Sequence, residues 1–215
     1  MSFCALVATL VGCQSNHPIT IVEKARRTRE LRNEADECFR RFNRSHSQDL
    51  EALECLADKH RETVEMHGSP TLCPLCYLNY GRSVRLLGVY QWTLRNKLAQ
   101  LLDSDKPVDR ADVERRIQRA NDEMRDYFRQ SVEHLEMYLG VTTAGNRLRI
   151  QVYDWLSQQY GELGDYARAL RYVTMLTQTA ELNSHDRRIV EKRRNGYERL
   201  LENQQNERVR AALAN

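Results

Sequence analysis

The feature that most constrains this chain is a helical period of hydrophobic residues, which recurs along most of its length. The clearest example runs from Val113 to Leu139, where apolar side chains return every three or four residues. That spacing places them on one face of an α-helix. Only 9 glycines and 4 prolines occur among 215 residues, so the chain has little of the turn chemistry that an all-β fold needs. We therefore predict an all-α protein built from antiparallel helical hairpins.

The periodic segments predict seven helices separated by short loops. Gly68 is expected to end the second helix and Asp109 to cap the start of the fourth. The third and fourth helices should lie antiparallel because the loop between them is short. The predicted helices cover about residues 19–42, 48–66, 74–102, 110–139, 146–160, 166–180 and 185–208.

Charge and motif content argue against several functional classes. Lys and Arg number 33 against 30 Asp and Glu, a net charge of +3, whereas a nucleic-acid-binding protein usually carries a marked basic excess. The sequence has no Ser-His-Asp arrangement, phosphate-binding glycine loop or HExxH motif. Acidic residues such as Glu136, near Arg129, are interpreted as partners in surface ion pairs. We expect no nucleic-acid partner, no cofactor and no enzymatic activity.

The N-terminus has the pattern of an export signal. An apolar run from Phe3 to Val11 is followed by Gly12 and Cys13, and apolar stretches that end in small residues are typical of secretory signals. The segment Leu10-Val11-Gly12-Cys13 resembles the lipobox of bacterial lipoproteins.

The lipobox resemblance implies a processed, lipid-anchored chain. Residues 1–12 would be a cleaved signal peptide, and the Cys13 thiol would carry a diacylglycerol. Residues 13–18 would form a tether, and residues 19–215 a single helical domain. Gln14 after the cysteine implies the outer membrane of the bacterial cell envelope, with the protein facing the periplasm. The alternative is an N-terminal tail with an ordinary cysteine.

Residues 150–183 fit one frame of about 34 residues that resembles a tetratricopeptide (TPR) repeat. The positions that carry the resemblance are expected to pack within the hairpin. They are Tyr153, Leu156, Tyr160, Gly164, Tyr166, Ala169, Val173 and Leu176. Gly164 would make the turn, and Ala169 would let the two helices approach closely.

The resemblance implies that the protein binds a protein or peptide through a helical surface. Gln151, Asp154 and Gln158 lie on the first helix of the hairpin at positions that could face a groove. The preceding helices are longer than a TPR repeat allows. Both a TPR-like superhelix and an elongated helical bundle therefore remain open as architectures.

Six cysteines offer a second kind of chemistry. With Cys4 in the signal and Cys13 lipidated, Cys38, Cys55, Cys73 and Cys76 remain, and an even number in an exported protein favours disulfides in any of three connectivities. The Cys73-Pro-Leu-Cys76 segment also permits a thiol-redox pair at a helix start. A third interpretation is a zinc site completed by His60, His67, Cys38 or Cys55.

Together these patterns predict a non-enzymatic scaffold lipoprotein of the bacterial envelope, which binds an unidentified protein or peptide through its helical surface. The alternative is a cytoplasmic or periplasmic helical protein that binds zinc or exchanges thiols through Cys73 and Cys76.

Overall fold

The described part of the chain is entirely helical apart from its connections. The computed structural model describes residues 20–45, 49–104, 107–143, 146–179 and 182–213. Of these residues 88% are helical and none forms a strand, which confirms the all-α prediction. The helices are α1 (Ile21–Arg44), α2 (Leu50–His67), α3 (Pro74–Leu102), α4 (Arg110–Val141), α5 (Asn146–Leu163), α6 (Tyr166–Thr177) and α7 (Ser184–Leu213).

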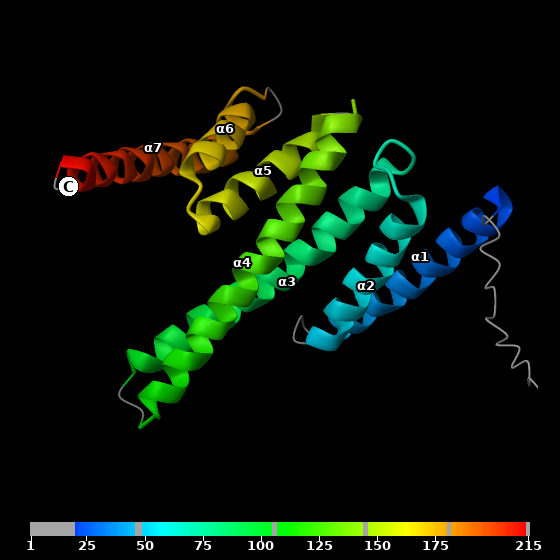
Figure 1. Ribbon diagram of the computed structural model, residues 1–215, viewed down its shortest axis with the longest axis horizontal. Helices are drawn as coiled ribbons and strands as arrows, with labels where there is room; N and C mark the ends of the chain where they lie inside the picture. Colours follow the sequence, from blue (N-terminus) through cyan, green and yellow to red (C-terminus); the bar gives the residue numbers. More distant parts are fainter. Residues whose placement is uncertain (1–19, 46–48, 105–106, 144–145, 180–181, 214–215) are drawn as a thin grey trace, which may run out of the picture.

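The helices contact one another mainly in chain order. Each pairs with the helix before and after it, and α3 and α4 form the longest hairpin (Figure 1). The molecule is elongated, with α1 at one end and the C-terminal end of α7 at the other (Figure 1). Contacts restricted to neighbours are typical of stacked helical hairpins, in which each unit buries the open face of the next.

Local side-chain chemistry sets the helix ends. Asp109 caps α4 by accepting a hydrogen bond from the Asp112 amide, and Gly68 ends α2 with a φ of 69°, both as predicted. Pro74 occupies the first turn of α3, which begins and ends at the predicted residues. Asn183 caps α7, since its side-chain oxygen accepts from the Asp186 amide.

Three helices end at least three residues away from the predicted position. α5 continues past Tyr160 to Leu163 because the turn comes at Gly164, whose φ is 79°. α6 ends at Thr177, before the predicted 180. α7 runs to Leu213, beyond the predicted 208, because residues 209–213 contain no glycine or proline and include two alanines, which favour a helix.

Residues 1–19 lie outside the described residues, and with them the predicted signal peptide, the tether and Cys13. Among the described helices, none combines the length and the apolar character needed to cross a membrane.

The main core extends from α1 to α6, and a smaller cluster around Val173, Leu176 and Val190 joins α6 to α7. Glycines allow the closest approach of α3 and α4. A Cβ placed on Gly88 would overlap the Phe128 ring, and one placed on Gly81 would lie 2.9 Å from the Leu135 side chain. The long α3–α4 hairpin therefore depends on small residues at these crossings.

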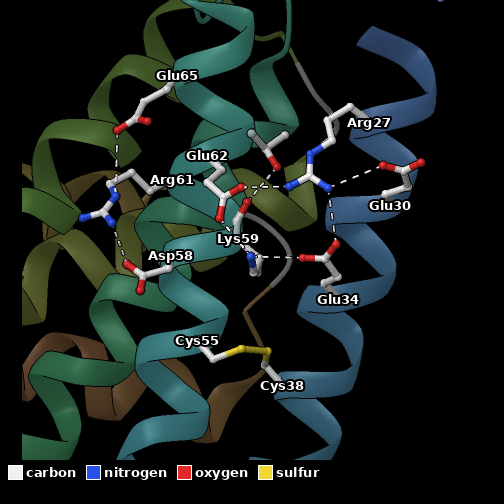
Figure 2. A network of polar contacts seen from close by, with 11 residues as sticks. Arg27, Glu30, Glu34, Cys38, Cys55, Asp58, Lys59, Arg61, Glu62 and Glu65 are labelled. Atoms are coloured by element: carbon white, nitrogen blue, oxygen red, sulfur yellow. Dashed lines mark hydrogen bonds and ion pairs between the residues drawn. A yellow bond between two sulfur atoms is a disulfide. The ribbon is translucent and has the colours of Figure 1, made fainter. Parts of the chain in front are cut away.

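Charged residues join the outer faces of α1 and α2. Arg27 of α1 reaches Glu62 of α2 at 3.1 Å, and Lys59 of α2 bridges Glu34 at 3.0 Å and Glu62 at 2.9 Å (Figure 2). The hydrogen bond from Lys59 lowers the pKa of the Glu62 carboxyl. Such exposed pairs set the register of the hairpin more than they stabilise it, because solvent screens them.

Candidate functional site

The residues predicted to pack in the TPR-like hairpin lie in α5, α6 and the turn between them. Most are buried, while Tyr153 and Tyr166 are half-buried and Gly164 forms the left-handed turn. The fully or nearly fully buried ones are Leu156, Tyr160, Ala169, Val173 and Leu176. Tyr160 stacks on Tyr172 with ring centroids 5.9 Å apart. The hairpin thereby fixes the face of α5 that is turned toward α3 and α7.

A groove of about 560 Å³ opens between α3, α5 and α7. These three helices alternate with α4 and α6 along the chain. The lining mixes aromatic, apolar and polar side chains. It consists of Arg85, Val89, Trp92, Phe128, Gln158, Gln159, Gly161, Glu162, Tyr166, Tyr197 and Leu200.

Arg85 is the half-buried cation of this groove. Its guanidinium carbon lies 5.3 Å from the centroid of the Trp155 ring, a cation–π distance. Burial lowers the pKa of Arg85, while the charge of Asp154 acts in the opposite direction. No carboxylate of the described residues lies within ion-pair distance of it. Arg85 is thus a charged donor with no carboxylate of the described residues within ion-pair distance, although the charge of Asp154 acts on it, and its site opens to solvent.

Gln159 adds a second polar group whose bonding is incomplete. Its side chain is only 1% exposed, and Nε2 donates to the Trp155 carbonyl at 3.2 Å. Oε1 has no hydrogen-bond partner among the described residues. A buried amide oxygen without a hydrogen-bond partner is uncommon, and it destabilises the folded state by about 1–3 kcal/mol.

Hydrogen bonds between α3 and α5 hold one edge of the groove. The Trp92 indole N–H donates to Glu162 at 3.1 Å, and Arg95 lies 3.6 Å from the same carboxylate. Trp92 is nevertheless 38% exposed, so one side of its ring remains open. On the opposite edge, Leu200 of α7 is 42% exposed.

α7 is docked on α5 through a small polar cluster. Arg193 donates to Asp154 at 2.6 Å and to the Ser157 hydroxyl at 3.1 Å. Tyr197 donates to the Ser157 carbonyl at 2.9 Å, and its ring occupies the space next to Gly161. These contacts hold α7 in position as the third helix that borders the groove.

The residues predicted to face a groove have different roles. Gln158 lines it. Asp154 is engaged by Arg193 and by the Gln158 amide, and Gln151 is exposed and does not belong to the lining. Tyr166, interpreted from the sequence only as a packing residue, lines the groove as well.

Sequence reasoning missed Arg85 and Trp92. Arg85 lies between the buried residues Val84 and Leu87 on the most apolar helix. The sequence signal that could have identified Arg85 was a charged side chain within the apolar residues of this helix. That Arg85 and Gln159, which lie far apart in the chain, line the same groove could come only from the structure.

The interpretation of Glu136 as a surface ion-pair residue is wrong. One of its oxygens accepts from Tyr160 at 2.8 Å and from Tyr172 at 2.7 Å, whereas Arg129 pairs with Asp126. Burial and the hydrogen bond to Glu136 raise the pKa of Tyr160 to about 12. Glu136 therefore joins α4 to the hairpin of α5 and α6.

A second hollow, of about 300 Å³, lies between α1, α2 and α3 and contains His60, Asp36 and Ser83. Burial lowers the pKa of His60 to about 4. The His60 Nδ1 lies 3.3 Å from the Ser83 hydroxyl, but that hydroxyl donates to the Tyr80 carbonyl and its side chain is 1% exposed. This serine is therefore not presented to a substrate.

The four cysteines of the predicted domain lie in two separate pairs. Cys38 of α1 is bonded to Cys55 of α2, and Cys73 is bonded to Cys76 at the start of α3. The Cys38–Cys55 bond joins α1 and α2 next to the charged network (Figure 2). His67 lies beside the second pair, whereas His60 faces Ser83. Cys4 and Cys13 are outside the described residues.

No protein-family model, curated protein or solved structure matches the chain. The groove and the cysteine cluster are therefore interpreted from their own chemistry.

Proposed function

We propose that this protein is a non-enzymatic scaffold that binds a protein or peptide partner in the groove between α3, α5 and α7. The observation that carries the proposal is the half-buried Arg85, which has no carboxylate of the described residues within ion-pair distance yet lines an open groove. Such a guanidinium gains most from a carboxylate supplied by a ligand, because a charge-assisted bond is stronger away from bulk water.

The rest of the lining defines the partner's chemistry further. Trp92, Tyr166 and Leu200 provide aromatic and apolar surface near Arg85. The best match is a peptide segment with an acidic residue next to a large apolar side chain. Aromatic and arginine side chains supply much of the affinity of many protein interfaces.

A selection from a random peptide library on the immobilised protein tests this proposal. Enriched peptides should share a carboxylate beside an apolar residue. Arg85→Ala should weaken their Kd by roughly tenfold or more, the effect expected of a central arginine. Arg188→Ala is the matched control, because Arg188 is exposed on α7 and does not line the groove.

Two results would contradict the binding proposal. One is a selection that enriches no peptide above background. The other is a set of enriched peptides that bind Arg85→Ala as tightly as the unchanged protein.

The scaffold is proposed to act at the bacterial envelope, held by lipid on Cys13 and facing the periplasm from the outer membrane. The support is the lipobox-like segment before Cys13. Growth of a two-membrane bacterium that expresses the gene with an alkyne fatty acid should label the protein, and Cys13→Ala should abolish the label. Equal labelling of the Cys13→Ala variant, or no labelling of either protein, would refute the anchor.

A further inference from the structure

Three metal-binding side chains meet where α2 gives way to α3. His67 is the last residue of α2, Cys73 immediately precedes α3, and Cys76 lies in its first turn. One ligand atom from each lies within 4.8 Å of the other two. The loop between His67 and Cys73, with its left-handed Gly68, turns the chain back so that these residues converge.

A hydrogen bond from α1 determines which nitrogen of His67 can bind a metal. The Thr28 hydroxyl donates its only hydrogen to the Lys24 carbonyl at 2.7 Å. Its oxygen also lies 3.1 Å from Nε2 of His67, so when the hydroxyl donates to Lys24, Nε2 carries the ring hydrogen and donates it to Thr28. In the neutral ring the lone pair then resides on Nδ1. Histidines that bind zinc are commonly oriented by such an N–H bond to an oxygen.

The two sulfurs lie at the N-terminal end of α3, where the helix dipole favours negative charge. Cys73 occupies the capping position but makes no side-chain capping hydrogen bond. Its sulfur is bonded to Cys76 in the structure. Opening that disulfide would leave two thiols at the positive end of a helix and beside a histidine.

We propose that the reduced Cys73–Cys76 pair and His67 form a zinc site. A dithiol reductant supplies two electrons and two protons to the disulfide, giving two thiols while the reductant becomes a disulfide. Zinc binding then releases both thiol protons to water. Tetrahedral ligands with bonds of about 2.0–2.3 Å lie about 3.5–3.8 Å apart, so a modest separation of the sulfurs brings all three atoms into range.

The site holds three protein ligands and leaves the fourth coordination position open. Within the described part of the chain no further His, Cys, Asp or Glu belongs to the group. His60, Cys38 and Cys55, the other ligands that the sequence permits, have partners elsewhere. Thiolate and imidazole ligands in a tetrahedral arrangement favour zinc over magnesium or calcium.

Zinc and cobalt titrations of the full chain, reduced and kept without oxygen, test the proposal. The reduced protein should bind one zinc that competes with a chromophoric chelator. Cobalt should give tetrahedral d–d bands and a sulfur-to-cobalt charge-transfer band. The oxidised protein should bind neither metal at this site.

Variants identify the ligands. His67→Ala and Cys76→Ser should each weaken zinc binding by more than the roughly 10- to 100-fold cost of losing an outer hydrogen bond. Thr28→Val, which keeps the side-chain shape, should weaken it within that range. His185→Ala and Cys55→Ser are matched controls that should retain zinc and the cobalt spectrum.

The proposal is overturned if the reduced protein binds no zinc, or if His67→Ala binds it as tightly as the unchanged protein. Circular dichroism of each variant shows whether its helices remain folded. Thr28→Val tests the same site through a partly exposed residue outside the coordinating group.

Discussion

Single small side chains decide how closely the helices of this protein approach one another. Gly88 is buried in α3, and the Phe128 ring of α4 occupies the position that a Cβ at Gly88 would need. Phe128 also lines the groove. The packing at this crossing therefore affects both the stability of the hairpin and the floor of the candidate site.

Gly88→Ala should lower the free energy of unfolding by about 1–3 kcal/mol, because a methyl group forced into a packed core displaces its neighbours. Urea unfolding followed by circular dichroism measures the change. Gly140→Ala is the control, because a Cβ at Gly140 meets nothing within 4 Å. That substitution in α4 should be neutral or stabilise by about 0.5–1 kcal/mol. Equal effects at both positions would contradict the packing of α3 on α4.

His60 should make stability depend on pH. Burial lowers its pKa to about 4 from the ordinary value of 6.5, although Asp36 acts in the opposite direction. Below about pH 6.5 the unfolded chain binds a proton that the folded chain does not take up until about pH 4. The stabilisation is therefore complete above pH 6.5 and is lost as the pH falls toward 4, by on the order of 1–3 kcal/mol.

The comparison with His60→Gln isolates this effect from the carboxylates that titrate in the same range. Urea unfolding near pH 7 and at about pH 4.5 gives, for each protein, the change in the free energy of unfolding between the two pH values. The variant should lose less stability on acidification. Parallel losses in the two proteins would show that His60 is not the responsible group.

At the scale of helices, α7 is held by a few polar contacts to α5 and by the packing of Val190 against α6. Arg193 and Tyr197 bind Asp154 and Ser157 of α5, while most other α7 side chains are exposed. A helix held by so few contacts should open more readily than the core.

Arg193→Ala should raise the amide hydrogen exchange of α7 by roughly tenfold, the factor expected from losing about 1.4 kcal/mol of local stability. Exchange in α3 and α4 should be unaffected. Arg188→Ala is again the control, since Arg188 is exposed and lies outside the polar cluster. Unchanged exchange of α7 in Arg193→Ala would contradict the docking of α7 through Asp154.

Helix positions were predictable because the signal is local. The stripe from Val113 to Leu139, the Asp109 cap and the Gly68 terminator each act within a few residues. The length of α7 was underestimated because its last turn follows a polar stretch and its described side chains, 209–212, are exposed. The role of Glu136 was missed because the tyrosines that bind it belong to α5 and α6.

At the scale of the whole molecule, the order of contacts creates the groove. Since each helix packs chiefly on its neighbours, α3, α5 and α7 are brought to one side by the intervening helices. The sequence predicted hairpins and one TPR-like frame, and from them a binding function. It named Gln158, which lines the groove, but not Arg85, Gln159 and Leu200, because these lie on three different helices.

The metal-ligand trio was partly visible from the sequence. The Cys73-Pro-Leu-Cys76 spacing indicated a pair at a helix start, and His67 was one of several candidate ligands. Choosing His67 required the position of the loop after Gly68 and the contact with Thr28 of α1. Such long-range contacts leave no pattern in a single sequence.

The most direct test of the proposed function is hydrogen exchange of the protein with and without a selected acidic–apolar peptide. The peptide should slow exchange in α3 around Arg85 and Trp92, and in the facing parts of α5 and α7, and Arg85→Ala should remove that protection. Protection confined to α1 and α2, or protection that persists in Arg85→Ala, would contradict the proposal that the α3–α5–α7 groove is the binding site.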